Sequence, residues 1–314
     1  MTDTMTLTVT DRIDDLGNIA RIRFAGAALP AFTAGAHLDL WLPGFGAWRQ
    51  YSLCSDPAET GYYEIAVLKD PASRGGSEAV HATARVGATF TVEGPRNHFP
   101  LVEDAARTVL LGGGIGITPM LAMARRLHAL GRDFTLHYCT RSRDVTAFLD
   151  QLEGAPFADR VVLHFDDAGD DQRLDLTRDL PAPAPDAHIY VCGPQGFMDW
   201  VIATAESAGH ANVHREYFSA DVDKTGGSFE VEARASGKTL TVGPGDTIAK
   251  VLAANGIKVE VKCEEGVCGT CVTDVLDGEI DHRDRFLTEE ERGDGDQMCV
   301  CCSRARGARL VLDI

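Results

Sequence analysis

Three closely spaced cysteines near the carboxyl end constrain the fold more than any other feature of this chain. Cys263, Cys268 and Cys271 stand in the stretch CEEGVCGTC, and six of the nine cysteines lie after residue 262. The amino-terminal residues resemble neither a signal peptide nor a transit peptide, so we expect the protein in the cytoplasm. Thiols stay reduced in that compartment. The cysteine loop is therefore expected to hold a metal centre rather than disulfides.

The spacing of the cysteines indicates which metal centre this is. C-x₄-C-x₂-C is the spacing of plant-type [2Fe–2S] ferredoxins, which need a distant fourth cysteine. Structural zinc sites usually have C-x₂-C pairs or mixtures of cysteine and histidine, and no second pair follows at such a distance. The fourth ligand must then come from MCVCCS, which contains Cys299, Cys301 and Cys302. Adjacent Cys301 and Cys302 would face opposite sides of a strand, so only one of them can easily reach a cluster.

The chain divides into three stretches of different character. Residues 1–103 hold short alternating apolar runs broken by glycine and proline, which predict an antiparallel barrel or sandwich. In residues 104–222 apolar runs alternate with helix-like segments, a pattern typical of a parallel sheet. A polar linker, DVDKTGG, is expected to permit movement. Residues 228–314 then begin with a predicted hairpin.

The helices of the last two stretches are predicted from their apolar periodicity and caps. DTIAKVLAANG reads as a short helix with Asp246 as its N-cap and Gly256 as its C-cap. In the middle stretch the helix-like segments are PMLAMARRLHAL, DVTAFLDQL and QGFMDWVIATAESAG.

A glycine-rich stretch follows the first apolar run of residues 104–222. LLGGGIGITP joins a predicted strand to a predicted amphipathic helix, with Pro119 in the first helical turn. Its glycines permit a tight turn and bring backbone N–H groups close to a phosphate. YVCGP ends another predicted strand, and parallel sheets bind nucleotides at the carboxyl ends of their strands. We expect a dinucleotide site, although the loop lacks the last glycine of the usual fingerprint and an unliganded turn remains the alternative.

Two shorter stretches of residues 1–103 indicate a cofactor that carries a phosphate. RQYSL supplies Arg49, Tyr51 and Ser52, and RGGS spans residues 74–77. An arginine, the amides of a glycine pair and a serine hydroxyl together suit a phosphate. A tyrosine beside a serine suits a flavin ring. From this chemistry alone, RQYS can equally be an edge strand and RGGS a turn.

These signals, in this order, resemble the phthalate dioxygenase reductase family, which includes the reductases of vanillate demethylase. The residues that carry the resemblance are RQYSL, RGGS, GPRNHFPL, GGGIGITP, VCGPQGFM, EYF, CEEGVCGTC and CCSRA. The resemblance covers essentially the whole chain and implies a multidomain protein of α/β plus β class. Its expected parts are an antiparallel β-barrel flavin domain over residues 1–103, a parallel α/β nucleotide-binding domain over 104–222 and a β-grasp plant-type ferredoxin domain over 228–314.

The resemblance also implies roles for individual residues. The expected flavin contacts are Arg49, Tyr51, Ser52 and Leu53, with the flavin phosphate on Arg74, Gly75, Gly76 and Ser77. The expected dinucleotide contacts are Gly112, Gly113, Gly114, Gly116, Thr118, Pro119, Cys192, Gly193 and Pro194. The expected catalytic residues, where flavin meets nicotinamide, are Ser52, Cys192, Glu216 and Phe218. The expected cluster ligands are Cys263, Cys268, Cys271 and Cys301, because the family's fourth cysteine is followed by x-S-R-A. Plain packing roles are the alternatives for Cys192 and Phe218.

The function implied by the resemblance is electron transfer to a partner enzyme. NADH would pass electrons through FMN, which is favoured over FAD, and a [2Fe–2S] cluster to a terminal oxygenase. A Rieske-type aromatic ring dioxygenase or O-demethylase is the first expectation for that partner, and a haem monooxygenase is the second. Arg141 and Arg143 would suit the 2′-phosphate of NADPH, which keeps that cofactor open. The non-enzyme alternative is a redox-sensing regulator that binds the cofactors without turnover.

Charge and hydropathy exclude several classes of partner. The chain carries 30 Lys and Arg against 47 Asp and Glu, a net charge of −17. Such an acidic protein is not expected to bind nucleic acid or an anionic membrane. No run of about 20 apolar residues is present, so no membrane span is predicted. A monomer is the expectation typical of the family.

Overall fold

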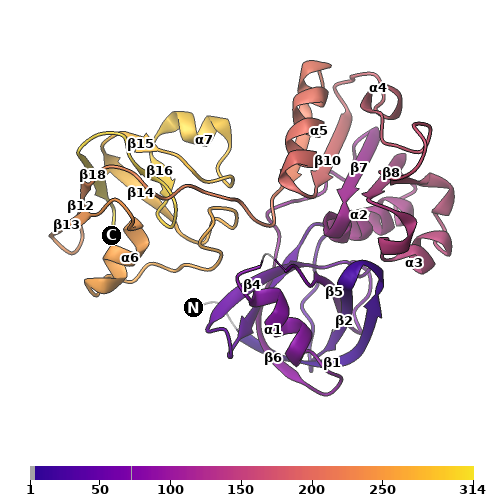
Figure 1. Cartoon of the computed structure of the whole chain (residues 1–314), viewed down its shortest axis with the longest axis horizontal. Coiled ribbons are helices and arrows are strands. Elements are labelled where there is room, and N and C mark those ends of the chain that lie inside the picture. Colours follow the sequence, from indigo (N-terminus) through magenta and orange to yellow (C-terminus); the bar gives the residue numbers. More distant parts are fainter. Residues whose placement is uncertain (1–3, 72) are drawn as a thin grey trace. The chain divides into compact units, whose positions relative to one another are not determined.

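The computed structural model describes residues 4–71 and 73–314, which form two compact units, Met1–Glu216 and Tyr217–Ile314 (Figure 1). The first unit contains an antiparallel sheet followed by a parallel sheet, and the second contains a mixed sheet. No helix in the described part of the chain has both the length and the apolar character needed to cross a membrane.

The antiparallel sheet of the first unit has the strand order β4-β3-β6-β1-β2-β5. A bridge between Leu53, just after β4, and Ile65 of β5 brings the two outer strands together, so the sheet closes into a barrel. The interior is filled by apolar side chains such as Ile22, Leu38 and Leu40, all fully buried. The elements are β1 (Thr4–Asp15), β2 (Ile19–Ala25), β3 (His37–Leu42), β4 (Ala47–Ser52), β5 (Tyr63–Leu68), α1 (Gly76–Thr83) and β6 (Thr89–Arg96).

The parallel sheet has the strand order β11-β10-β7-β8-β9, as the alternating apolar and helical pattern predicted. Leu110, Tyr138 and Tyr190 on one face share a buried core with α2. The strands are β7 (Arg107–Gly113), β8 (Phe134–Thr140), β9 (Val161–Phe165), β10 (Ala187–Cys192) and β11 (Asn212–Glu216). The α-helices are α2 (Ile117–Ala129), α3 (Leu149–Glu153), α4 (Leu176–Asp179) and α5 (Gln195–Ser207).

The prediction of one continuous helix over DVTAFLDQL is wrong. The segment instead contains a 3₁₀ turn at Arg143–Val145 and then α3, with Phe148 between them at a positive φ of 64°. The Phe148 ring is fully buried, and its backbone N–H donates to the Asp15 carboxylate at 3.0 Å. Tertiary contacts therefore override the local helical periodicity.

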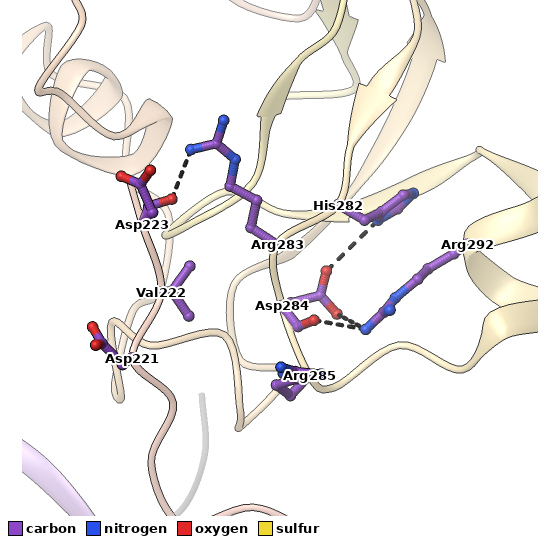
Figure 2. Close-up of a pocket in the computed structure, with 8 residues that line it drawn as sticks. All are labelled: Asp221, Val222, Asp223, His282, Arg283, Asp284, Arg285 and Arg292. Carbon is purple, nitrogen blue, oxygen red and sulfur yellow. Dashed lines mark hydrogen bonds and ion pairs between the residues drawn. The ribbon is translucent and has the colours of Figure 1, made fainter. Parts of the chain in front are cut away.

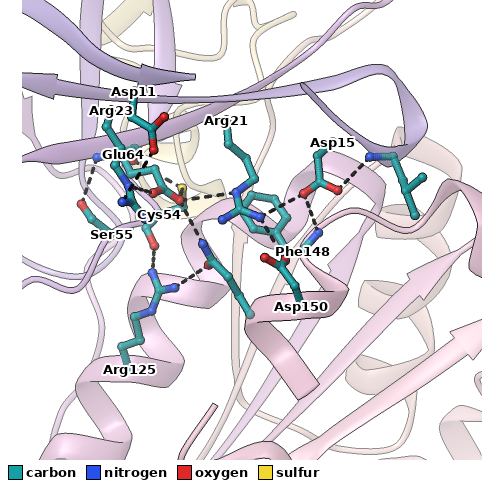
Figure 3. A network of polar contacts seen from close by, with 12 residues as sticks. Asp11, Asp15, Arg21, Arg23, Cys54, Ser55, Glu64, Arg125, Phe148 and Asp150 are labelled. Carbon is teal, nitrogen blue, oxygen red and sulfur yellow. Dashed lines mark hydrogen bonds and ion pairs between the residues drawn. The ribbon is translucent and has the colours of Figure 1, made fainter. Parts of the chain in front are cut away.

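A buried polar network joins the two sheets of the first unit (Figure 3). Arg21, only 4% exposed, lies 3.2 Å from Asp15 and 3.0 Å from Asp150 of α3. Glu64, 2% exposed, accepts a hydrogen bond of 2.5 Å from Arg23. Charges this deeply buried are tolerated only when they are paired. The network consequently fixes the barrel against the helices of the nucleotide-binding sheet.

The second unit is built on a mixed sheet of order β13-β12-β18-β14-β16. The predicted hairpin is confirmed, since β12 pairs antiparallel with β13, and β12 also pairs parallel with β18. The strands are β12 (Phe229–Ala233), β13 (Lys238–Val242), β14 (Val272–Asp277), β15 (Ile280–Asp281), β16 (Gln297–Cys299), β17 (Arg304–Ala305) and β18 (Arg309–Leu312). The helices are α6 (Ile248–Ala254) and α7 (Glu289–Asp294).

Both predicted caps of α6 are wrong by one residue. The N-cap is Thr247, whose hydroxyl accepts from the N–H of Lys250 at 3.3 Å, and the C-cap is Asn255. The carbonyl of Asp246 instead accepts from Arg304 at 2.7 Å. Gly256 follows the C-cap with a φ of 78°, a conformation that favours glycine.

The polar linker does not hang freely as its composition suggested. Arg304, 3% exposed, donates to the carbonyls of Lys224 and Gly227, each at 2.9 Å. Arg283 donates to the carbonyls of Asp223 and Thr225, each at 2.6 Å. These contacts attach residues 223–227 to the second unit, so the prediction that this segment permits movement is not supported within the unit.

Candidate functional site

Three neighbouring parallel strands end side by side at the carboxyl edge of their sheet. Cys192, the last residue of β10, pairs in register with Gly112 of β7 on one side and with Glu216, the last residue of β11, on the other. Nucleotides bind at this edge of open α/β sheets. The Cys192 side chain is fully buried, and burial raises the pKa of its thiol. The thiol is therefore protonated and unsuited to act as a nucleophile.

The glycine-rich loop packs so tightly on this edge that side chains are excluded. A Cβ added to Gly116 would lie 2.2 Å from the carbonyl oxygen of Cys192. A Cβ on Gly113 or on Gly193 would lie 2.9 Å from the Phe197 ring. The backbone of the loop can consequently approach a dinucleotide closely, which is the fit that a pyrophosphate requires.

The other predicted residues of this loop contribute to its shape. Gly114 has a φ of 53° and opens a 3₁₀ turn that leads into α2. The buried Thr118 donates its hydroxyl hydrogen to the carbonyl of Ile115 at 3.0 Å, and Pro119 is buried in the first turn of α2. Pro194 is exposed and precedes α5.

The edge strand β4 of the barrel reaches the same edge of the parallel sheet. Ser52, the last residue of β4, donates a hydrogen bond of 3.4 Å to the Glu216 carboxylate. Burial removes water from that carboxylate and raises the pKa of Glu216 to about 8, although the bond from Ser52 opposes the shift. Glu216 therefore holds a proton at neutral pH. Two predicted catalytic residues, 164 positions apart, are in contact here.

The predicted phosphate site lies at the amino end of α1. Gly75, with a φ of 98°, precedes the helix, and Arg49 of β4 lies against Gly76. A Cβ on Gly76 would be 3.0 Å from Nε of Arg49, so glycine alone leaves room for that guanidinium. Ser77 donates to Ser73 at 3.0 Å. Backbone N–H groups at a helix start beside a guanidinium form a site suited to an anion.

The remaining residues of the predicted flavin site differ in exposure. Tyr51 is half-buried, and burial raises the pKa of its hydroxyl, so the ring can pack against a planar ligand without ionising. Arg74 is exposed. Leu53 is fully buried in the barrel core and has no exposed side chain with which to contact a cofactor.

The cysteine loop gathers its sulfurs in the second unit. Cys263, Cys268 and Cys271 are all buried, and the sulfur of Cys301 interacts with those of Cys263 and Cys271. The backbone N–H of Glu265 donates to the Cys263 sulfur at 3.4 Å. Four buried sulfurs with N–H donors suit an iron–sulfur cluster, whose ligands are thiolates.

The three candidates for the fourth cysteine lie in different environments. Cys299 ends β16, and its sulfur interacts with that of Cys271. Cys302 instead packs on Gly266, where an added Cβ would meet its sulfur at 2.5 Å. The expectation that Cys301 and Cys302 lie on a strand is wrong. The N–H groups of Cys302 and Ser303 both donate to the carbonyl of Cys299, which makes a turn.

A pocket of about 380 Å³ lies beside this turn and is lined by charged residues (Figure 2). Asp284, 2% exposed, lies at its centre and accepts from the hydroxyl of Ser303 at 3.3 Å and from the N–H of Leu287 at 2.8 Å. Arg292 donates to the Asp284 carbonyl at 2.6 Å and lies 3.6 Å from its carboxylate. Asp284 and Arg292, which line the pocket, thus connect the cysteine turn to α7.

Two residues of these sites were not predicted from the sequence. Phe197 packs on Gly113 and Gly193, and its position inside VCGPQGFM was the available signal. Asp284 supports the cysteine turn, and no local pattern marked it. Phe218, predicted at the flavin, lies in the second unit and is 39% exposed.

Comparisons with known proteins agree with this geometry. An oxidoreductase NAD-binding domain model matches residues 110–202, and a 2Fe-2S iron-sulfur cluster binding domain model matches residues 231–306. Vanillate O-demethylase oxidoreductase of Pseudomonas sp. (strain HR199 / DSM 7063) is 51% identical over 96% of each chain.

Two solved structures extend the likeness over the whole chain. Phthalate dioxygenase reductase matches with a TM-score of 0.74 and 37% identity, over 99% of this chain and 98% of that one. An intact type IV self-sufficient cytochrome P450 monooxygenase matches with a TM-score of 0.88 and 38% identity, over 99% of this chain and 41% of that one.

Proposed function

Since this chain belongs to the phthalate dioxygenase reductase family, an NAD(P)H-dependent group of electron-transfer oxidoreductases, we propose that it delivers electrons from NADH singly to a terminal oxygenase. A bound flavin supplies the necessary chemistry, because it accepts two electrons as a hydride and releases them one at a time. The contact between Ser52 and Glu216 carries the proposal, because it joins the predicted flavin strand to the nucleotide edge of the sheet. The task of the protein is to align two bound rings at this point.

On the flavin side, the proposal gives each residue a task. Arg49, Gly75, Gly76 and Ser77 hold the phosphate at the start of α1, with Arg74 at its exposed rim. Tyr51 packs against the ring, and the hydroxyl of Ser52 lies at its reactive edge. The backbone of Leu53 pairs with that of Ile65 and so closes the barrel. A single phosphate site of this kind suits FMN, which ends at that phosphate, better than FAD.

On the dinucleotide side, the glycines of the loop and of the β10 edge bring backbone N–H groups to the pyrophosphate. These glycines are Gly112, Gly113, Gly114, Gly116 and Gly193, and the proposed dinucleotide contacts also include Thr118, Pro119 and Pro194. Cys192 forms part of the surface against which the nicotinamide would pack, and the protonated Glu216 can donate a hydrogen bond there. A role for Phe218 near the flavin remains part of the proposal.

NADH is the proposed electron donor rather than NADPH. Arg143 forms an ion pair with Glu153, so one of the two arginines that would suit a 2′-phosphate is already compensated in charge. The ratio of kcat/KM for NADH and NADPH tests this directly. A tenfold preference for NADPH, equivalent to about 1.4 kcal/mol, would reverse the assignment.

In the second unit, Cys263, Cys268, Cys271 and Cys301 are the proposed ligands of the [2Fe–2S] cluster. Cys301 is chosen over its neighbours because its sulfur interacts with two loop cysteines, whereas Cys299 meets one of them and Cys302 packs on Gly266. The buried Asp284 holds the turn that presents Cys301.

The proposed partner is a Rieske-type oxygenase, either an aromatic ring dioxygenase or an O-demethylase. The 51% identity to a vanillate O-demethylase oxidoreductase favours it. A haem monooxygenase is the second candidate, favoured by the likeness to a self-sufficient cytochrome P450. We place the protein in the cytoplasm, because nine free cysteines need a reducing compartment. A monomer is proposed only because it is typical of the family.

Visible and EPR spectra of the anaerobic protein, before and after one equivalent of NADH, test the electron path. We expect loss of flavin absorption together with a rhombic signal from the reduced cluster. Loss of flavin absorption without that signal would leave a flavoprotein whose cysteine loop carries no electrons. A protein without flavin absorption would refute the proposal. Mixing the reduced protein with a Rieske oxygenase or with a ferric haem monooxygenase then identifies the acceptor by its faster oxidation.

A further inference from the structure

A cluster of metal-ligating side chains lies in the parallel sheet, separate from the cysteine loop. His137 of β8, His164 of β9 and Asp179 at the end of α4 each offer one ligand atom, and these atoms lie within 4.8 Å of one another. Both histidines are 3% exposed, and the Asp179 side chain is 11% exposed. Among residues 4–71 and 73–314 this is the one group of three or more histidine, cysteine or acidic side chains whose ligand atoms lie this close together.

The two imidazoles already face each other through ring nitrogens. Nδ1 of His137 lies 2.9 Å from Nε2 of His164. Two Zn–N bonds of about 2.0 Å at a tetrahedral angle place their nitrogens roughly 3.3 Å apart. The rings would therefore need to separate by only about 0.4 Å to admit an ion, which is within the reach of small side-chain rotations.

The hydrogen bonds around the pair prepare the nitrogens as ligands. Nδ1 of His164 lies 3.2 Å from the carbonyl oxygen of Gln172 and donates to it, which leaves the lone pair of Nε2 directed at His137. Metal-ligating histidines commonly donate their second N–H to a backbone carbonyl in this way. Nε2 of His137 has no hydrogen-bond partner among the described residues, so it can take the proton when Nδ1 binds a metal.

The charges at the cluster are compatible with a divalent ion. Oδ2 of Asp179 accepts from Arg178 and from the N–H of Asp175, each at 2.8 Å, whereas Oδ1 accepts only from Arg178, at 2.7 Å, and so keeps a second lone pair for a metal. Cys139 lies on the same face of the sheet, in register with His164, but its sulfur does not lie within 4.8 Å of all three ligand atoms.

We propose that His137, His164 and Asp179 bind one divalent transition-metal ion of the zinc class. Two imidazoles and one carboxylate are the ligands that Zn²⁺ uses in three-ligand sites, and they disfavour Mg²⁺ and Ca²⁺, which prefer oxygen alone. A water molecule completes the tetrahedron. The ion links β8, β9 and α4, so it stabilises the outer edge of the nucleotide-binding sheet.

The chain contains a matched control for this site. Nδ1 of His188 and Nε2 of His214 are also 2.9 Å apart, on the neighbouring strands β10 and β11. That pair belongs to no group with a third ligand among the described residues. A histidine pair without a carboxylate is therefore present in the same sheet and can be changed in the same way.

The test is equilibrium dialysis of the untagged, cluster-loaded protein against low-micromolar Zn²⁺, followed by zinc analysis and X-ray absorption at the zinc edge. We expect one zinc per chain with a nitrogen and oxygen shell at about 2.0–2.1 Å. His164→Gln and Asp179→Asn should each raise the Kd at least tenfold, whereas His188→Gln should leave it unchanged.

Three results would overturn the proposal. These are no bound zinc at low-micromolar concentration, equal zinc binding in the His164→Gln and unmodified proteins, or a shell of sulfur alone that survives His164→Gln and so places the zinc on the cysteine loop. If His164→Gln unfolds the sheet, Asp179→Asn still tests the site, because the Asp179 side chain is more exposed than either histidine. Retained flavin and cluster absorption confirms that each variant is folded.

Discussion

Gly116 offers a direct test of the dinucleotide site, because the effect of one methyl group can be worked out from the structure. Its φ of −63° is an ordinary helical value, so alanine introduces no backbone strain there. The added Cβ, however, would lie 2.2 Å from the carbonyl oxygen of Cys192, which is 1.2 Å short of the closest ordinary contact of 3.4 Å. The carbonyl of Cys192 is backbone and the new Cβ is fixed to the backbone of residue 116. Neither can rotate away, so the loop and the end of β10 must move apart.

The expected consequence of Gly116→Ala has two parts. Overpacking of this kind costs about 1–3 kcal/mol of stability. A displacement of about 1 Å at the reacting groups lowers a rate by roughly 100-fold, so we expect slower flavin reduction by NADH as well as weaker NADH binding. Stopped-flow absorbance measures the reduction rate, an NADH titration measures the Kd, and thermal unfolding measures the stability.

Gly196→Ala is the matched control for this experiment. Gly196 lies in the first turn of α5, near the same edge, and an added Cβ there meets nothing within 4 Å. Alanine should be neutral or slightly stabilising at this position, since it has the higher helix propensity. If Gly116→Ala behaves like Gly196→Ala in all three measurements, the close approach of the loop to β10 does not govern the site.

Three further predictions concern the remaining parts of the electron path. The pKa of Glu216 is raised to about 8, so the folded apoprotein should lose stability as the pH rises from about 4.5 to 8. Glu216→Gln should flatten that loss in thermal unfolding. An unchanged pH profile in this variant would show that Glu216 is not buried as described. Cys301→Ser should abolish the reduced-cluster EPR signal but keep flavin reduction, whereas Cys302→Ser should keep both; the reverse result would make Cys302 the ligand. Arg304→Lys should free residues 223–227 for limited proteolysis and lower the stability of the second unit by about 1–3 kcal/mol, because the carbonyls of Lys224 and Gly227 lose hydrogen bonds from a charged donor. Equal cleavage rates would contradict the anchoring.

The predictions that succeeded rest on local patterns. The strands of the parallel sheet and the hairpin of the second unit follow from runs of apolar residues and from turn residues, which act over a few positions. The predictions that failed depended on distant partners. Phe148 breaks an apparent helix because its ring is buried against Arg21, 127 positions away, and Arg304 binds a linker that looked mobile from its composition.

The sequence by itself determined the kinds of sites in this protein. The spacing of Cys263, Cys268 and Cys271, and the glycines from Gly112 to Gly116, indicate the chemistry because those residue types act through local backbone geometry. Only the tertiary structure decided which residues meet. The contact of Ser52 with Glu216, the proximity of Cys301 to the loop cysteines and the pairing of His137 with His164 all join separate elements. Such contacts depend on how strands are ordered and packed, and that order is set by the burial of whole faces rather than by any short stretch of residues.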